Sequence, residues 1–175
     1  MIAFDLLVDE APGHAEAEGM PSFSAFEQAA PELAREVRGR LDAHAHKTIA
    51  TLRRDGSPRI SGTESRFADG ELWIGSMWRA RKVQDLRRDA RFALHTGSDD
   101  PPGWTGDAKL AGVAEEITDP QLVAAINGGD ATSRPSHLFR LDLREVSAVH
   151  LVEDGTALVI DVWTPRHGVS TISPG

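Results

Sequence analysis

Three Asp-Gly pairs divide much of this chain into short segments of strand character. They stand at Asp55-Gly56, Asp69-Gly70 and Asp154-Gly155. Asp-Gly between two β-like runs is a strong signal for a tight hairpin, because both residues tolerate the positive φ angles that such turns need. Short connections of this kind join antiparallel strands, whereas parallel strands need long crossovers. The pattern therefore predicts a mainly β, antiparallel fold that closes into a barrel, with a few flanking helices.

The runs between these turns predict strands at 46–52, 58–67, 71–76, 92–96, 109–117, 138–152 and 156–163. We expect the first three to follow one another as a meander, because only tight turns separate them. Apolar and polar residues alternate well in the segment 138–152, but the alternation slips near Glu145. Such a slip indicates a β-bulge.

Helical periodicity precedes and interrupts these strands. Apolar residues recur at helical spacing at Leu33, Val37 and Leu41. Ser24 followed by Glu27 indicates a capping box at the start of this segment, and Pro31 is expected to divide it. Two further helices are predicted over 78–89 and 119–126, the latter with a proline in its first turn.

The beginning of the chain lacks this regularity. Residues 1–22 hold two prolines and two glycines with little periodicity, which predicts a flexible N-terminal arm before a single domain over 23–175. Acidic residues stand where a secretion signal carries basic ones. No run approaches the roughly 18 apolar residues of a membrane span. These features predict a cytoplasmic protein that does not bind a membrane.

Composition excludes several kinds of site. The chain has no cysteine, which rules out disulfides, thiolate metal sites and cysteine nucleophiles. Its formal net charge is −8, which argues against nucleic acid as a partner. His44 and His46 would share one face of a strand, but no third ligand is evident, and we predict no metal site.

Against this acidic background, basic residues gather between positions 79 and 91. A predicted strand ends at the small residues Gly75 and Ser76, and Arg79, Arg81 and Lys82 follow at or near the start of a helix. The free N–H groups of a helix start favour an anion. Arginine can hold a phosphate by two parallel hydrogen bonds, and lysine adds a point charge. The segment suits a phosphate site, although a solvated basic helix face would show the same composition.

The order of these motifs resembles that of the pyridoxamine 5'-phosphate oxidase-like split-barrel flavoproteins. The resemblance rests on Arg54-Asp-Gly-Ser-Pro58, Asp69-Gly-Glu-Leu-Trp73, Arg81-Lys82 and Leu86-Arg-Arg-Asp-Ala-Arg91. It covers residues 46–96 well and departs at Ala90, where the family usually has proline. The resemblance implies a split β-barrel of the FMN-binding type. It also implies a homodimer that holds its cofactor in the groove between two barrels.

For the cofactor site, the resemblance implies that Arg81 and Lys82 bind the flavin phosphate. The spacing Arg79-Ala-Arg81-Lys82 offers Arg79 as one cation more than the family pattern requires, and we expect it to share this role. The remaining cofactor contacts implied in this way are Arg59, Ile60, Ser61, Gly62, Ile74, Gly75 and Ser76. The implied activity is hydride transfer to or from a small organic substrate. Catalytic side chains stay unassigned, because a flavin itself carries the hydride.

Two alternatives to FMN oxidoreductase activity stay open. Some relatives bind a deazaflavin, coenzyme F-420, in the same groove. Other proteins on this barrel would be non-catalytic carriers of flavin, haem or another tetrapyrrole. Where the oxidase itself has a lysine, this chain has Glu64, Ser65 or Arg66, which argues against synthesis of pyridoxal phosphate. Trp78 and Trp104 are candidates for stacking on a ligand.

Overall fold

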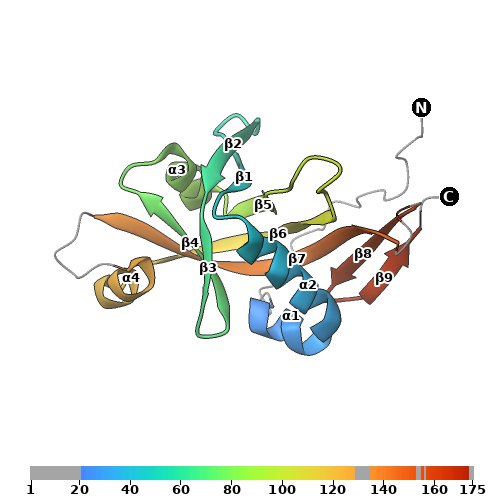
Figure 1. Cartoon of the computed structure of the whole chain (residues 1–175). Coiled ribbons are helices and arrows are strands. Elements are labelled where there is room, and N and C mark those ends of the chain that lie inside the picture. The colour runs from blue at the N-terminus through green and yellow to red at the C-terminus, as the bar shows by residue number, and fades with distance from the viewer. Residues whose placement is uncertain (1–20, 129–134, 153–154, 156, 174–175) are drawn as a thin grey trace.

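A computed structural model describes residues 21–128, 135–152, 155 and 157–173 of the chain. Nine strands form one sheet, and every strand pair in it is antiparallel, as predicted (Figure 1). The strands are β1 (Lys47–Leu52), β2 (Pro58–Thr63), β3 (Ser65–Ala68), β4 (Glu71–Met77), β5 (Arg91–His95), β6 (Gly106–Ile117), β7 (Ser136–Leu151), β8 (Leu158–Thr164) and β9 (Gly168–Ile172).

The prediction of one strand over 58–67 is wrong. The segment breaks at Glu64 into β2 and β3, which lie at opposite ends of the strand order β2-β1-β5-β6-β7-β4-β3. β2 pairs with β1, whereas β3 pairs with β4, so the expected meander does not form. Because the two outermost strands follow each other in the chain, the turn at Glu64 brings the two ends of the sheet together as a barrel.

Local turn chemistry produces the predicted hairpins. Gly56 has a φ angle of 81°, while Asp69 and Gly70 have 52° and 78°. Asp154 lies outside the described residues, but β7 and β8 pair on either side of it. The bulge expected near Glu145 is confirmed, because the β6–β7 register shifts between Ala111 and Gly112, where Glu145 is the last residue before the shift.

Two N-terminal helices cover one side of the barrel, α1 (Phe23–Ala29) and α2 (Pro31–Ala43). Figure 1 shows them together beside β7. The predicted cap at Ser24 is wrong: the chain is still extended at Ser22, whose hydroxyl accepts a hydrogen bond from the Ala25 N–H. Ser24 already lies in the first turn, where its hydroxyl donates to Glu71 over 3.4 Å. Pro31 opens α2, as the division at this residue predicted.

The hydrophobic core lies between these helices and the barrel. Phe23 and Phe26 are fully buried, and the Phe26 ring lies 4.7 Å from the ring of Trp163, centroid to centroid. From α2, Leu33, Val37 and Leu41 face the same core, as their spacing predicted. Full burial of a large apolar side chain contributes roughly 1.5–3 kcal/mol. This packing holds α1 and α2 against β6 and β7.

The other two helices lie away from α1 and α2 (Figure 1). α3 (Arg81–Arg88) begins later than predicted, because the backbone of Arg79 has a left-handed φ of 61° and cannot belong to a right-handed helix. α4 (Pro120–Asn127) forms where it was predicted. The Asp119 side chain caps its first turn, and Gly128 ends it in the left-handed conformation.

The described part of the chain ends in a hairpin that no sequence pattern predicted. β8 was predicted, but β9 follows it after a turn at Gly168, whose φ angle is 67°. β9 is exposed along its whole length, so no apolar alternation marks it in the sequence. At the other end, residues 1–20 of the predicted arm lie outside the described residues. None of the described helices is both long and apolar enough to cross a bilayer.

Candidate functional site

A cavity of about 710 Å³ opens where the barrel is not closed by hydrogen bonds. Within the described sheet, β2 pairs only with β1, and β4 pairs only with β3 and β7. The β2 and β4 backbones therefore face each other without a ladder, and the cavity lies beside them. Its volume falls within the range of about 300–1,000 Å³ that is typical of small-ligand sites.

Most of the predicted cofactor contacts line this cavity, although they come from three separate elements. β2 contributes its middle, β4 its end and α3 its first turn. The predicted residues found in the lining are Arg59, Ile60, Ser61, Gly62, Gly75, Ser76, Arg81 and Lys82. The structure thus brings β2 next to α3, although the β3–β4 hairpin separates them in the chain.

Two predicted contacts are not part of the lining. Ile74 is fully buried and belongs to the hydrophobic core together with Leu72, on the same face of β4. Ser76 shares that face by strand alternation but lies nearer the end of β4, where it lines the cavity instead of the core. Arg79 is exposed in the turn before α3, where its positive φ angle takes it out of the helix.

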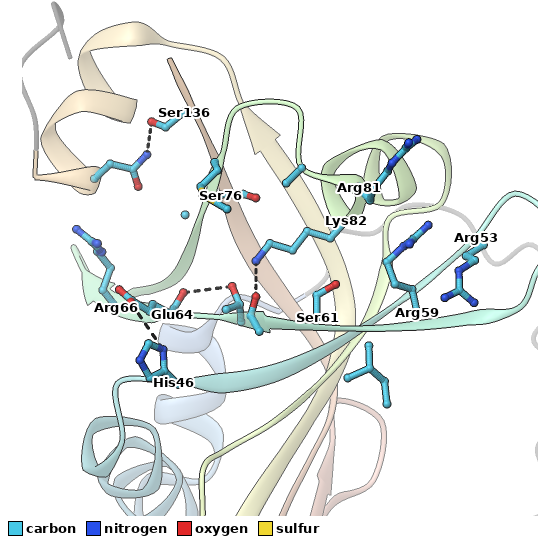
Figure 2. Close-up of a pocket in the computed structure, with 17 residues that line it drawn as sticks. His46, Arg53, Arg59, Ser61, Glu64, Arg66, Ser76, Arg81, Lys82 and Ser136 are labelled. Atoms are coloured by element: carbon cyan, nitrogen blue, oxygen red, sulfur yellow. Dashed lines mark hydrogen bonds and ion pairs between the residues drawn. The ribbon is translucent and has the colours of Figure 1, made fainter. Parts of the chain in front are cut away.

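Lys82 reaches across the cavity from α3 to β2. Its Nζ donates a hydrogen bond to the Gly62 carbonyl over 2.8 Å. Burial lowers the pKa of Lys82, and the nearby carboxylate of Glu64 partly opposes that shift. Figure 2 shows the side chains of Arg81 and Lys82 extending in different directions, because consecutive helical residues point about 100° apart. Lys82 is thus the cation that spans the cavity between α3 and β2.

Arginines continue the positive lining on the other side of Lys82. Arg59 donates from Nε to Asp85 over 2.6 Å, and Arg53 donates to the Pro58 carbonyl over 2.9 Å. Both residues, with Arg81, also line an adjoining cavity of about 680 Å³. Its other lining residues are Arg54, Asp55, Gln84, Asp85 and Arg88. In a chain of net charge −8, this is a local concentration of cations that favours an anionic ligand.

Asn127 and Ser136 line the same cavity, although neither was among the predicted contacts. Asn127 ends α4 and donates to the Ser136 hydroxyl over 2.9 Å at the start of β7. A Cβ atom at Gly75 would lie only 2.8 Å from the Asn127 amide oxygen. Gly75 therefore lets α4 approach β4. No local motif marks this contact, since the partners lie far apart in sequence.

The rim of the cavity is apolar on both sides. Ile60 is 75% exposed on β2, and Met77 is 81% exposed at the end of β4. Next to Met77, Trp78 is half-exposed and stacks on His137, with an interplanar angle of 3°. Large apolar side chains exposed around a polar cavity are typical of a surface that a partner or ligand covers.

The two histidines considered for metal binding face different partners. His44 lies 3.9 Å from Asp99, and His46 lies 3.8 Å from Glu64. The residues that the structure describes do hold one group of three possible ligands, formed by Glu36, His150 and Asp161. There, the Arg40 guanidinium already lies 3.4 Å from the Glu36 carboxylate. A cation at that distance opposes the binding of a metal ion.

Comparison with solved structures first shows the class of fold. The chain resembles a pyridoxamine 5'-phosphate oxidase-related, FMN-binding protein of Nostoc punctiforme with a TM-score of 0.59 and 13% identity, over 86% of this chain and 96% of that one. PhzG of Burkholderia lata, solved with tetrahydrophenazine-1-carboxylic acid, gives a TM-score of 0.54 and 14% identity, over 82% and 88%. A Clostridium acetobutylicum protein related to general stress protein 26 gives 0.56 and 12%, over 75% and 94%. The fold is the split barrel that the resemblance implied.

The family follows from the sequence itself. The family model for pyridoxamine 5'-phosphate oxidase matches residues 33–150, which is more than half of the 175-residue chain. The chain therefore belongs to the pyridoxamine 5'-phosphate oxidase family. No curated protein matches it. The matched residues include the cavity-lining parts of β2, β4 and α3.

Proposed function

We propose that this protein is a flavin-dependent oxidoreductase that binds FMN in the cavity beside β2 and β4. The observation that carries the proposal is the lining itself, in which the β2 segment Arg59–Gly62 faces the cationic start of α3. Membership of the family supports it. The related Nostoc punctiforme protein is described as FMN binding, which agrees with the proposed ligand.

The lining suits a planar, polar heterocycle with a phosphate. The hydroxyl oxygen of Ser76 is buried and has no hydrogen-bond partner within the described part of the chain, although it belongs to the cavity lining. A buried polar atom without a partner costs free energy, which a ligand hydrogen bond would remove. At Gly62, a Cβ atom would meet nothing within 4 Å, so the backbone is open to a ligand.

In this proposal Arg81 and Lys82 bind the FMN phosphate, and Arg59 faces it from β2. Each charge-assisted hydrogen bond to a phosphate contributes roughly 1.5–3 kcal/mol. The flavin, when bound, supplies the chemistry by accepting or donating a hydride. The chain's own residues bind it, orient it between β2 and β4, and keep water from one of its faces. The proposed substrate is a small organic molecule.

The proposal does not extend to oxidation of pyridoxamine phosphate. The position where the oxidase carries a lysine is occupied here by Glu64, Ser65 or Arg66. Arg66 donates to the Ile126 carbonyl at the end of α4, and Glu64 faces His46. Arg66 does line the cavity, but it is held toward α4, and none of the three residues is a lysine. The same cavity would also suit the deazaflavin coenzyme F-420, which the experiment below distinguishes from FMN and from haem.

The exposed rim supports a homodimer with the cofactor at the interface. Ile60 and Met77 border the cavity from β2 and β4, and both are more than 70% exposed in the single chain. A second copy would cover these side chains and close the cavity. Light scattering at micromolar concentration is expected to give twice the 18.9 kDa mass of one chain. A monomer mass at that concentration would contradict the dimer.

Absorbance and titration test the cofactor. A bound flavin gives a band near ~450 nm, a deazaflavin a fluorescent band near ~420 nm, and haem a Soret band. We expect FMN binding, and a loss of about tenfold to a hundredfold in FMN affinity for Lys82→Ala. Arg81→Lys should also weaken FMN binding, because the two-pronged contact is lost while the charge stays. Fluorescence titration measures both.

Riboflavin and a distant lysine provide the controls. Riboflavin lacks the phosphate, so its affinity should be nearly the same for wild type, Lys82→Ala and Arg81→Lys. Lys109→Ala removes an equal charge from β6, where Lys109 is exposed and pairs with Asp107. It should leave FMN binding unchanged. An equal loss for FMN and riboflavin would show that these residues do not hold the phosphate.

A further inference from the structure

A buried carboxylate lies beneath the proposed phosphate site. Asp85 is on the inner side of α3 and is only 3% exposed. It accepts hydrogen bonds from Arg59 Nε over 2.6 Å, from Arg88 over 3.0 Å and from the Thr51 hydroxyl over 3.0 Å. Burial alone would raise the pKa of Asp85, but these hydrogen bonds together hold it below its ordinary value. Asp85 is therefore an anion at neutral pH.

A carboxylate beneath a phosphate site is unexpected, because it repels the phosphate. The hydrogen bonds of Asp85 indicate what it contributes in return. Only Nε of Arg59 is engaged by the carboxylate; the structure assigns its two terminal nitrogens no partner among the described residues. Arg59 lines both cavities, and Figure 2 shows it extending from β2 toward α3. Asp85 thus binds the Nε side of the guanidinium, and the two terminal nitrogens remain available to a ligand.

The same carboxylate joins the elements that carry the cations. Through Thr51 it contacts β1, through Arg59 it contacts β2, and it is itself part of α3. Arg81 and Lys82 begin that helix. Asp85 therefore sets the separation between the cations of α3 and the cation of β2. Such buried, fully bonded carboxylates hold their partners in one arrangement.

We propose that Asp85 is a positioning residue for the cofactor phosphate, which holds Arg59 so that its terminal nitrogens face the cavity. This inference rests on the proposed function, in which FMN occupies that cavity. Two effects of Asp85 on the phosphate oppose each other. Its charge repels the phosphate, whereas its hold on Arg59 favours binding. The sign of the change on neutralising Asp85 shows which of the two dominates.

The main test is FMN titration of Asp85→Asn, which keeps the size of the side chain and removes its charge. Positioning predicts about a tenfold loss of FMN affinity, with riboflavin affinity unchanged. Repulsion alone predicts tighter FMN binding. The matched control is Asp89→Asn, which removes a charge from the end of the same helix, where Asp89 pairs with Arg91 over 2.6 Å and lines neither cavity. It should leave FMN affinity unchanged.

A double-mutant cycle shows whether Asp85 acts through Arg59. In the Arg59→Gln background, Asp85→Asn should cause no further loss of FMN affinity, because the residue that it positions is gone. An equal loss in both backgrounds would overturn the proposal. Equal or tighter FMN binding by Asp85→Asn in the wild-type background would overturn it as well.

Arg59→Lys keeps the test decisive if Asp85→Asn fails to fold. Lysine keeps the positive charge and can pair with Asp85, but it has no second nitrogen to extend into the cavity. Positioning predicts about a tenfold loss of FMN affinity for this variant too. Unchanged FMN affinity would mean that Arg59 only neutralises Asp85. A wild-type protein that binds no flavin would overturn the proposed function and this inference together, whereas the outcomes above concern Asp85 alone.

Discussion

β6 and β7 form the closed side of the barrel, whereas β2 and β4 border its open side. β6 pairs with β7 from Gly106 to Ile117, and these strands are covered by buried phenylalanines of α1 and buried aliphatic residues of α2. Beside β2 and β4 the lining is mainly polar and cationic, with glycines and with the apolar Ile60 and Met77 at its rim. On the closed side, backbone and apolar groups find partners within the chain. On the open side, the Ser76 hydroxyl lines the cavity without a partner among the described residues, and in the proposed function a ligand would supply one.

Two glycines show the same difference at atomic scale. A Cβ atom at Gly112 in β6 would lie 1.9 Å from the Asp142 carbonyl oxygen, whereas one at Gly62 in β2 would meet nothing within 4 Å. The first glycine is needed for close packing of two strands. The second leaves room that the protein itself does not fill. We therefore expect stability to depend on the closed side, and the proposed ligand binding to depend on the open side.

The largest expected effect comes from the closed side. Phe26→Ala should lower the free energy of unfolding by about 3–5 kcal/mol, because Phe26 is fully buried against Trp163. Ser61→Ala, a change in the cavity lining, should alter it by no more than about 0.5 kcal/mol. Urea unfolding measures both. Similar losses for the two variants would contradict the division between the sides.

The same substitution, glycine to alanine, can be made on both sides of the barrel. Gly112→Ala should lower the free energy of unfolding by about 1–3 kcal/mol, because the added methyl group forces two backbones apart. Gly62→Ala should leave stability within about 0.5 kcal/mol and weaken FMN binding instead. Thermal unfolding and FMN titration separate these outcomes. A Gly112→Ala protein as stable as wild type would show that the closed side is not tightly packed.

The smallest expected effect is a pH dependence on the open side. In the proposed site, Lys82 would bind phosphate best as an ammonium ion, which is lost as the pH rises through its pKa. Because burial lowers that pKa, FMN affinity should begin to fall at a lower pH than it would with a lysine of ordinary pKa. The fall should be about fivefold, since neutral lysine still donates a hydrogen bond. Lys82→Arg should abolish it, and riboflavin titrated in parallel corrects for ionisation of the flavin ring.

Local patterns predicted the elements whose shape depends on a few neighbouring residues. Asp55-Gly56 and Asp69-Gly70 make the hairpins that were expected of them, and Asp119-Pro120 starts α4. Ser24 was chosen as a helix cap from the same kind of pattern, but Ser22 takes that role. Both serines precede helical residues, and only the path of the incoming chain decides between them. Boundaries were therefore less predictable than the elements themselves.

The resemblance and the ordered motifs predicted eight of the 17 residues that line the cavity, and the tertiary structure decided the rest. Gly75 and Ser76 line the cavity, while their neighbour Ile74 lies in the core. Arg79 is one of three clustered cations, yet a left-handed turn takes it out of the lining. Asn127 joins the site from α4. How far the core extends along a strand, the handedness of a turn and the contacts between distant elements are not visible in a local motif.

By itself, the sequence determined an antiparallel fold, the hairpins, and a cationic segment after a strand that ends in small residues. These features depend on local φ angles and on residue charge. Only the tertiary structure decided that 58–67 turns a corner at Glu64, that β2 and β3 lie at opposite ends of the sheet, and that a cavity opens beside β2 and β4. Strand order minimises the exposed apolar area and the unpaired backbone of the whole chain at once, so no single segment specifies it.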